Sequence, residues 1–293
     1  MTFAMIRDLI STAQLQELLD AGRAPVILDC RHDLAQPDWA CDVFVDSHLP
    51  GAILASMDDV LSGPHSVGAG RHPWPSIEQW RAQLATWRIT RDTPVVVYDQ
   101  HSGMFAARAW WLLKVSGHDQ VAVLDGGFRA WTQEGRLLES GVTQQEPAAS
   151  LESVADIEFD RTRLLTAEQL VDARDAGRPI IDSRAADRYR GENETIDAKA
   201  GHIPGALNRP FGLNLLPDGR IKPADDLRRE LTELLRGLNS DQAPVFYCGS
   251  GVTAAHNLLA MELAGLPGAA MYPPSWSGWI ETADHPVATG EQP

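Results

Sequence analysis

The chain of 293 residues contains the same series of motifs twice, and this internal repeat constrains its fold more than any other feature. Four segments of the first half, LLDAGRAPVILDCR, DSHLPGA, PVVVYD and GGFRAW, return in the same order in the second half as LVDARDAGRPIIDSR, AGHIPGA, PVFYC and PSWSGW. Asp182 lies 153 positions after its counterpart Asp29, and His202 lies 154 positions after His48. A nearly constant offset indicates two copies of one domain, each of ordinary domain size.

The repeat also sets the predicted domain boundaries. We predict a first domain over residues 1–141, a linker over 142–160 and a second domain over 161–293. The segment SGVTQQEPAASLESVAD (140–156) is rich in Ser, Glu, Gln and Ala and lacks apolar periodicity, which is typical of an exposed linker.

Short apolar runs predict the secondary structure of each copy. PVILD (25–29), PVVVYD (94–99) and VAVLD (121–125) are such runs in the first copy, and PIID (179–182), PVFYC (244–248) and AAMY (269–272) repeat the pattern in the second. Runs of this length, followed by a Gly-containing loop and a helical stretch, are typical of buried parallel strands. The sequence therefore predicts an α/β fold in which each copy is a parallel sheet covered by helices on both faces.

The net charge of the chain limits the classes of molecule that it is expected to bind. With 40 acidic against 25 basic residues, the formal net charge is -15, which argues against nucleic acid and anionic membranes, since both favour clustered Lys and Arg. No run of about 18 apolar residues is present, and Arg7 and Asp8 interrupt the apolar N-terminus before it reaches the length of a signal-peptide core. Three cysteines are too few for a disulfide framework. We therefore expect a cytoplasmic protein.

The two copies differ at one position that matters for chemistry. Ligands of parallel α/β sheets bind at the carboxyl ends of the strands. The loop after PVFYC begins with CGSGVT (248–253) and leads directly into a helical stretch, whereas the loop after PVVVYD is one residue longer and has no cysteine. Only the second copy can therefore carry thiol chemistry, on Cys248.

The residues around Cys248 favour a reactive thiolate. Gly249 and Gly251 allow successive backbone N–H groups to turn toward one point, and a helix N-terminus follows them. N–H groups arranged in this way stabilise a thiolate and raise its nucleophilicity at neutral pH. In the alternative interpretation, Cys248 is only a small apolar residue at the end of a strand.

These motifs carry a resemblance to a known family. CGSGVTA (248–254), the paired HLPGA and GHIPGA motifs, the DSR and RYRG segments and PSWSGW together resemble the tandem-domain rhodanese family of sulfurtransferases over nearly the whole chain. The resemblance implies two rhodanese-like domains, the first without activity, and no cofactor. It implies that Cys248 takes a sulfane sulfur from a small anionic donor, holds it as a persulfide, and passes it to a thiol or cyanide, with a thioredoxin-like reductant as a further partner. It also implies that the loop binds the substrate through Gly249, Gly251, Val252 and Thr253.

The loop residues divide the family by sulfur donor. Members that use thiosulfate carry basic residues in the loop, whereas those that use 3-mercaptopyruvate carry Gly-Ser or Gly-Thr, as Gly249 and Ser250 do here. The expected donor is therefore 3-mercaptopyruvate, with thiosulfate as the alternative. The resemblance implies that Ser250 relays a proton together with an Asp and a His of the first domain. Asp59 and His72 lie in the matching stretch, and His65 is an alternative to His72.

The carboxylate of the donor requires a cation. The resemblance places a substrate arginine in DRYRG (187–191), so Arg188 and Arg190 are the candidates, and a guanidinium fork suits a carboxylate. In the alternative interpretation the two arginines only form surface ion pairs. A second arginine that the resemblance leads us to expect before GHIPGA is absent from GENETID (191–197).

The sequence supports several other functions less well. A cysteine-dependent phosphatase would need an arginine at the end of the loop, where Ala254 stands. The spacing of Cys30, His32, Cys41 and His48 matches no usual zinc site, so no metal is expected. A protein that carries a persulfide for a partner, or senses redox state, is an alternative to an enzyme. A non-catalytic scaffold is disfavoured, because the cysteine lies in an intact loop.

Overall fold

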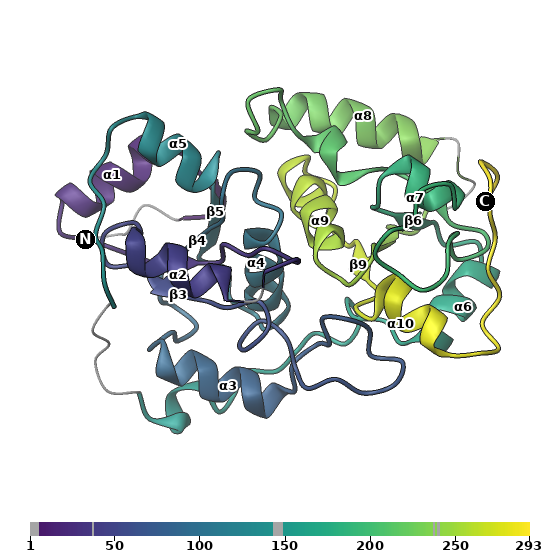
Figure 1. The fold of residues 1–293 in the computed structure, drawn as a ribbon, viewed down its shortest axis with the longest axis horizontal. Coiled ribbons are helices and arrows are strands. Elements are labelled where there is room, and N and C mark those ends of the chain that lie inside the picture. Colours follow the sequence, from purple (N-terminus) through teal and green to yellow (C-terminus); the bar gives the residue numbers. More distant parts are fainter. Residues whose placement is uncertain (1–5, 37, 143–148, 237, 239–240) are drawn as a thin grey trace. The chain divides into compact units, whose positions relative to one another are not determined.

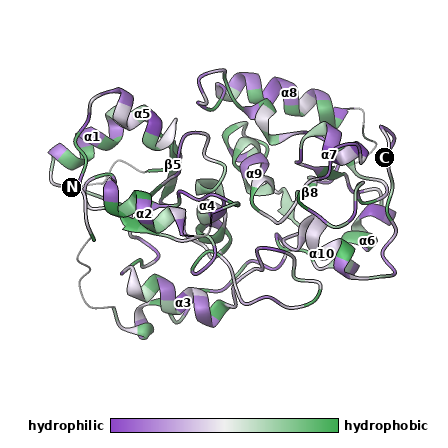
Figure 2. Ribbon diagram, viewed as in Figure 1, coloured by the Kyte–Doolittle hydropathy of each residue, from purple (hydrophilic) through white to green (hydrophobic). Residues whose placement is uncertain are grey.

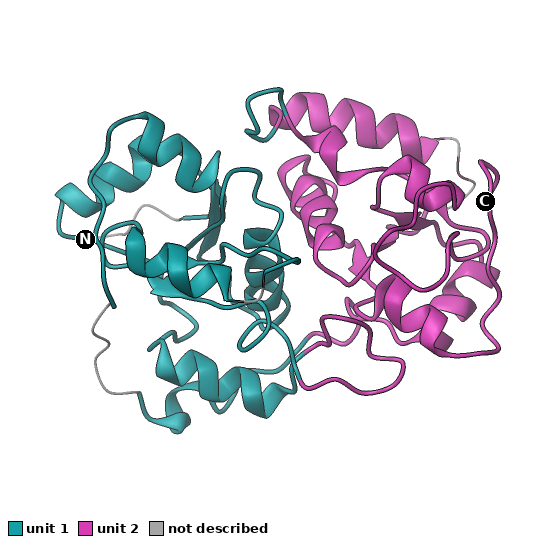
Figure 3. Ribbon diagram, viewed as in Figure 1, with its two compact units in different colours: residues 1–63, 75–159, 216–221 teal, residues 64–74, 160–215, 222–293 magenta. Residues whose placement is uncertain are grey.

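The computed structural model describes residues 6–36, 38–142, 149–236, 238 and 241–293, which form two compact units (Figure 3). The first unit contains residues 1–63, 75–159 and 216–221, and the second contains residues 64–74, 160–215 and 222–293. Each unit therefore consists mainly of one copy of the repeat, but residues 64–74 of the first half belong to the second unit. Part of the predicted linker, residues 143–148, lies outside the described residues, and the predicted domain boundaries stay a prediction.

The first unit is built on a five-stranded parallel sheet with the strand order β1-β5-β4-β2-β3 (Figure 1). The strands are β1 (Asp8–Ile10), β2 (Val26–Asp29), β3 (Ile53–Leu54), β4 (Val95–Tyr98) and β5 (Val121–Leu124). The helices around the sheet are α1 (Thr12–Asp20), α2 (Trp39–Asp46), α3 (Ile77–Thr86), α4 (Ala106–Val115), α5 (Gly127–Gln133) and the 3-10 helix η1 (Leu151–Val154). The three strands predicted for this copy are confirmed.

The second unit is built on a four-stranded parallel sheet with the order β7-β6-β8-β9. The strands are β6 (Ile180–Asp182), β7 (Leu207–Asn208), β8 (Val245–Tyr247) and β9 (Ala270–Met271). The helices around the sheet are α6 (Ala167–Asp175), α7 (Ala186–Arg190), α8 (Ala224–Arg236), α9 (Thr253–Leu263), α10 (Ser275–Glu281) and the 3-10 helix η2 (Phe211–Asn214). The predicted α/β class, with helices around a parallel sheet, is thus confirmed for both copies.

The second sheet repeats the arrangement of the first. The order β9-β8-β6-β7 corresponds to β5-β4-β2-β3. Leu164 forms a parallel bridge to Met271 at the place where Leu9 of β1 pairs with Val123 of β5. The end of β8, after which Cys248 follows, therefore corresponds to the end of β4.

Sequence signals at the helix ends explain where several helices begin and stop. Ser11, Ser76 and Thr166 each form a capping box with a Gln three residues later, so α1, α3 and α6 begin after them. Gly117 and Gly265 adopt φ angles of +80° and +68° just after α4 and α9, as expected of glycines that end a helix.

The helices differ in how much of their surface is buried. Helix α4 is buried over most of its length, whereas α8 buries Leu227 and Leu231 and carries charged residues between them (Figure 2). The core of each unit holds a tryptophan at a matching place, Trp131 and Trp279, and each indole N–H donates to a backbone carbonyl. In the described part of the chain, no helix has both the length and the apolar composition that crossing a membrane requires.

Candidate active site

Cys248 lies directly after β8 and is only 1% exposed. The N–H of Cys248 donates to Ser275 Oγ at 3.1 Å, and its carbonyl accepts the N–H of Trp276 at 2.9 Å. The carbonyl of Gly249 accepts the N–H of Ser277, also at 2.9 Å. The first residues of α10 therefore fix the backbone of the cysteine and of the residue that follows it.

The loop after Cys248 has a conformation that requires glycine. Gly251 has a φ of +75°, and Gly103 has a φ of +77° at the matching place in the first copy. Val252 is buried, and Thr253 is the first residue of α9. The residues predicted to bind the substrate through their backbone thus form a tight turn that ends at a helix N-terminus.

The matching loop of the first unit surrounds the side chain of its own first residue, Asp99. The carboxylate of Asp99, which follows β4, accepts the N–H groups of four loop residues at 2.8 to 3.3 Å. The donors are His101, Gly103, Phe105 and Ala106. Burial raises the pKa of the Asp99 carboxyl group, and these N–H groups counteract that effect. A loop of this type can therefore surround a negative charge with backbone donors.

A hydrogen bond joins His72 to Ser250. His72 Nδ1 lies 2.8 Å from Ser250 Oγ, and both side chains are buried. His65 instead lies 3.3 Å from a carboxylate oxygen of Glu281, and 63% of its side chain is exposed. Of the two histidines considered for the relay, His72 is the one that contacts Ser250.

The segment that carries His72 is held against α10. The N–H of Arg71 donates to Ser277 Oγ at 3.0 Å. A Cβ atom on Gly70 would lie 2.4 Å from the carbonyl oxygen of Pro274, so this close approach is possible only for glycine. These contacts bring His72 next to a loop that lies far from it in the sequence.

Asp59 lies in the first unit, on the surface. Its carboxylate accepts a hydrogen bond from Ser56 Oγ at 2.8 Å, and its N–H donates to the same oxygen at 3.3 Å. These bonds close a local turn. The role of Asp59 in a relay stays a prediction.

The two arginines predicted to bind the donor have different surroundings. A Cβ atom on Gly249 would lie 3.7 Å from Arg188 Nη1, so this guanidinium borders the cysteine loop. Arg190 forms an ion pair with the exposed carboxylate of Glu192 at 2.7 Å. Arg188 thus borders the cysteine loop, whereas Arg190 has the features of a surface ion pair, and the binding of the donor by either arginine stays a prediction.

A series of ion pairs with alternating charges leads from β6 to the cysteine loop. Of its members, only Arg188 is among the predicted site residues. In order, its members are Asp182, Arg184, Glu194, Arg188, Asp197 and Arg71. Arg188 Nη2 lies 2.9 Å from both Glu194 Oε1 and Asp197 Oδ2. Arg71 Nη1 lies 2.8 Å from Asp197 Oδ1. Asp197 therefore joins two guanidinium groups.

The pKa values of the two buried carboxylates next to Arg188 are shifted in opposite directions. Burial acts to raise the pKa of Glu194, but hydrogen bonds from Arg188 and from the N–H of Asp197 outweigh it, so this pKa is lowered. Burial raises the pKa of Asp197, because the attraction of Arg71 and Arg188 only partly offsets it. Asp197 is therefore protonated at a higher pH than an ordinary aspartate.

Part of this series of ion pairs could have been predicted from the sequence. Asp182 and Arg184 repeat Asp29 and Arg31 of the first copy, and both pairs form buried ion pairs at 2.6 to 2.7 Å. Arg71 directly precedes His72, which the sequence predicts as a site residue. Glu194 and Asp197 lie in a segment whose sequence does not match its counterpart in the first copy, so nothing in the pattern distinguishes them.

Comparison with known proteins identifies the family. The model of the rhodanese-like domain matches residues 11–134 and 166–282, which together make up most of the chain. The chain belongs to the rhodanese family.

Proteins similar to this rhodanese are named as sulfurtransferases. A Pseudomonas aeruginosa protein named "Probable 3-mercaptopyruvate sulfurtransferase" is 42% identical over 292 residues, which cover 96% of this chain and 100% of the relative. The thiosulfate sulfurtransferase of Gallus gallus is 32% identical over 288 residues and 96% of each chain. The crystal structure of a 3-mercaptopyruvate sulfotransferase from Escherichia coli has a TM-score of 0.78 and 29% identity, and covers 92% of this chain and 99% of its own. The chain is therefore a tandem rhodanese sulfurtransferase.

In the second rhodanese unit, Trp276 connects the charged residues to the cysteine. The Arg184 guanidinium lies over the Trp276 ring, 4.7 Å from its centre. The indole N–H donates to the carbonyl of Lys199 at 2.9 Å, and the backbone N–H of Trp276 holds Cys248. Trp276 therefore contacts both Arg184 and the backbone of Cys248.

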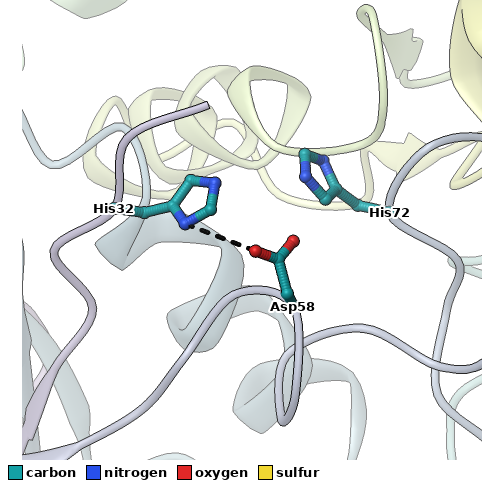
Figure 4. Close-up of side chains that lie close together, drawn as sticks. All are labelled: His32, Asp58 and His72. Carbon is teal, nitrogen blue, oxygen red and sulfur yellow. Dashed lines mark ion pairs between the residues drawn. The ribbon is translucent and has the colours of Figure 1, made fainter. Parts of the chain in front are cut away.

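In the first rhodanese unit, the histidines weighed as zinc ligands have local partners. His32 Nδ1 lies 3.9 Å from Asp58 Oδ2 (Figure 4). Burial lowers the pKa of His32, and the charge of Asp58 acts against this shift. His48 stacks on Phe44, and its Nδ1 lies 2.8 Å from the carbonyl oxygen of Phe44. Both histidines thus contribute to the packing of this unit.

Proposed function

We propose that this rhodanese transfers the sulfur atom of 3-mercaptopyruvate to a thiol or cyanide acceptor through a persulfide on Cys248. The observation that carries the proposal is the hydrogen bond of 2.8 Å between His72 Nδ1 and Ser250 Oγ, two residues beyond the cysteine. This pair supplies a base and a hydroxyl group in the segment that surrounds the reacting sulfur. The identity of the Pseudomonas aeruginosa relative, 42% over its whole length, supports the same donor.

The reaction of 3-mercaptopyruvate moves a proton. The Cys248 thiolate attacks the donor sulfur, so that an S–S bond forms and the C–S bond of the donor breaks. The electron pair of the C–S bond passes into the carbonyl group as an enolate. The thiol proton of the donor must then reach the enolate carbon, which gives pyruvate and the persulfide of Cys248. His72 and Ser250 lie at a distance suited to moving this proton.

Thiosulfate is the less suitable donor for this site. It transfers its outer sulfur to the thiolate and releases sulfite without any proton transfer, so it has no use for a His–Ser pair. Relatives that use thiosulfate are also expected to carry basic residues within the loop itself, whereas CGSGVT (248–253) contains none.

The cysteine loop is suited to holding the persulfide anion. In the matching loop of the first unit, the Asp99 carboxylate accepts four backbone N–H groups. Gly103 and Gly251 have nearly the same φ, so the two loops turn in the same way at this place. A persulfide on Cys248 would be stabilised by backbone donors of the same kind, without a protonated side chain that could neutralise it.

The second half of the reaction returns the enzyme to its starting state. A thiolate or cyanide attacks the outer sulfur, the S–S bond breaks, and the Cys248 thiolate leaves. A thioredoxin-like protein is one of the thiol acceptors that we propose. The cytoplasm, predicted from the small number of cysteines, keeps such thiols reduced.

The test is steady-state kinetics with 3-mercaptopyruvate and thiosulfate in parallel, on the wild type and on Cys248→Ser. The proposal expects a higher kcat/KM with 3-mercaptopyruvate and no transfer by the serine variant. A kcat/KM at least about tenfold higher with thiosulfate would contradict the donor. Retained activity of Cys248→Ser with both donors would contradict the persulfide route.

A further inference from the structure

A cavity of the second unit is lined by residues other than those described around Cys248. Its volume is about 720 Å³, which is within the range of small-molecule sites. Arg209, directly after β7, and Lys222 contribute cations to its wall, and Leu213 and Leu234 contribute apolar surface. Because β7, β6 and β8 are parallel, the end of β7 lies at the same edge of the sheet as the end of β8. This edge is where such sheets bind ligands.

The first copy has an alanine where Arg209 stands in the second. The N–H of Arg209 donates to the carbonyl of Asp182 at 2.9 Å, and the N–H of Ala55 donates to the carbonyl of Asp29 at 2.8 Å. Asp29 and Asp182 are counterparts in the repeat, so the two donors occupy equivalent positions, and both are buried. Burying a cation is costly, and the shared fold accepts alanine at this position. The fold alone therefore does not explain the guanidinium group of Arg209.

The charge of Arg209 is poorly compensated. Its side chain is 4% exposed, and its Nη1 donates to the side-chain oxygens of two neutral amides, Asn214 and Asn257. In the part of the chain that the structure describes, its one carboxylate partner is Glu230, 3.5 Å from Nη2. Burial lowers the pKa of Arg209, because the attraction of Glu230 only partly offsets it. A further negative charge near Nη2 would therefore be favourable.

Glu230 is shared with a second cation. Its Oε1 accepts a hydrogen bond from Lys222 Nζ at 2.7 Å, so one carboxylate faces two cations. Arg229 and Glu233, which also line the cavity, each form an ion pair within α8. Among the described residues of the cavity, two cations against one carboxylate thus leave one positive charge uncompensated, on a chain whose net charge is -15.

The cavity also exposes apolar surface. Leu213 is 50% exposed, and it lines the cavity together with Leu234. Contact with an alkyl chain would remove this surface from water, which is favourable. One uncompensated positive charge beside an apolar wall is suited to a ligand that has one negative charge and a short apolar chain.

We propose that this cavity binds a small organic monocarboxylate with a short alkyl chain, whose carboxylate lies between Arg209 and Lys222. The planar guanidinium group suits a carboxylate, and the ligand would supply the negative charge that Glu230 provides only once for two cations. The site takes part in neither donor binding nor persulfide formation, so its test is independent of the proposed function.

The experiment titrates the protein with butanoate and follows the methyl NMR signals of Leu213 and Leu234, assigned through Leu213→Ile and Leu234→Ile. We expect saturable shifts of both signals with a Kd of about 1 mM. Leu137 is the matched control, because it is 76% exposed on the first unit, and its signal should not move. Butanamide has the same shape without the charge, and it should bind at least about tenfold more weakly.

Two variants test the charges of the cavity. Lys222→Gln should weaken the binding of butanoate by about tenfold or more, since hydrogen bonds from charged donors are strong. Glu230→Gln removes the competing carboxylate and should strengthen it by about threefold. Lys114→Gln is the matched control: this lysine pairs with Asp8 at 3.4 Å on the first unit, and its replacement should leave the Kd unchanged. Thermal unfolding identifies any variant that does not fold.

Three results would overturn the inference. These are the absence of saturable shifts of Leu213 and Leu234 up to about 50 mM butanoate, a Kd for butanamide equal to that for butanoate, and an unchanged Kd for Lys222→Gln. Arg209→Ala, which copies the residue of the first copy, should lose the binding. If that variant does not fold, Lys222→Gln decides, because the side chain of Lys222 is less buried.

Discussion

Replacing Ser250 with alanine should separate the two sulfur donors. The hydroxyl group of Ser250 lies 2.8 Å from His72 Nδ1, and the change removes this group without adding volume. Proton transfer by a positioned group contributes about 10²- to 10⁴-fold to a rate. We therefore expect kcat/KM with 3-mercaptopyruvate to fall by about 100-fold or more. With thiosulfate, which transfers its sulfur without a proton, the change should stay below about tenfold.

The effect on stability is a separate quantity that must be measured with the rates. Ser250 is buried, so losing its hydrogen bond costs about 1–3 kcal/mol, and each kcal/mol lowers Tm by about 2–4 °C in a chain of this size. The assay follows pyruvate from 3-mercaptopyruvate and sulfite from thiosulfate, at a temperature well below Tm. Ser116→Ala is the control, because it removes a buried hydroxyl that accepts the indole N–H of Trp80 at 3.1 Å in the first unit. It should change neither donor's rate.

Two results would refute this reasoning. If Ser250→Ala lost activity equally with both donors, Ser250 would only shape the loop. If it kept full activity with 3-mercaptopyruvate, the proton would not travel through this hydroxyl group.

Three more predictions follow from the charged residues. Asp99→Asn replaces a carboxylate that accepts four N–H groups, so differential scanning calorimetry should show that the free energy of unfolding falls by about 1–3 kcal/mol. The same change at the exposed Asp119 should cause no such loss. Burial, with the charge of Glu194, raises the pKa of Asp197, while Arg71, Arg188 and Arg184 act against this shift. Because a protonated Asp197 holds Arg188 less strongly, the KM for 3-mercaptopyruvate should fall as the pH is lowered from neutrality, and Asp197→Asn should abolish this dependence in a pH profile of KM. Folding lowers the pKa of Glu194, so its charge stabilises the folded protein at pH values above the pKa of the unfolded state. The difference in Tm between the wild type and Glu194→Gln should therefore narrow as the pH falls toward about 4. A difference in Tm that stays constant would contradict this.

The repeat made most of the fold predictable from the sequence. Continuous apolar runs such as PVVVYD (94–99) correspond to strands, and Gly117 and Gly265 mark helix ends, because these signals act within a few residues. The strands β1 (Asp8–Ile10), β3 (Ile53–Leu54) and β7 (Leu207–Asn208) were not predicted. A strand of two or three residues is too short for a period of two to be visible.

The candidate site was predictable only in its local part. The cysteine loop was visible because residues 248–253 are contiguous and differ from the matching loop. The ion pair between Arg71 and Asp197 joins residues 126 positions apart, and its formation depends on segment 64–74 packing on the second unit. Periodicity and composition report on neighbours in sequence, so they contain no information on such a contact.

Mass spectrometry of Cys248 after treatment with 3-mercaptopyruvate tests the central claim most directly. The protein is mixed with the donor in the absence of acceptor, desalted and digested without reductant. The account predicts that the peptide with Cys248 gains the mass of one sulfur atom, that peptides with Cys30 and Cys41 do not, and that cyanide removes the added sulfur. An active enzyme whose Cys248 stays unmodified under these conditions would contradict the account.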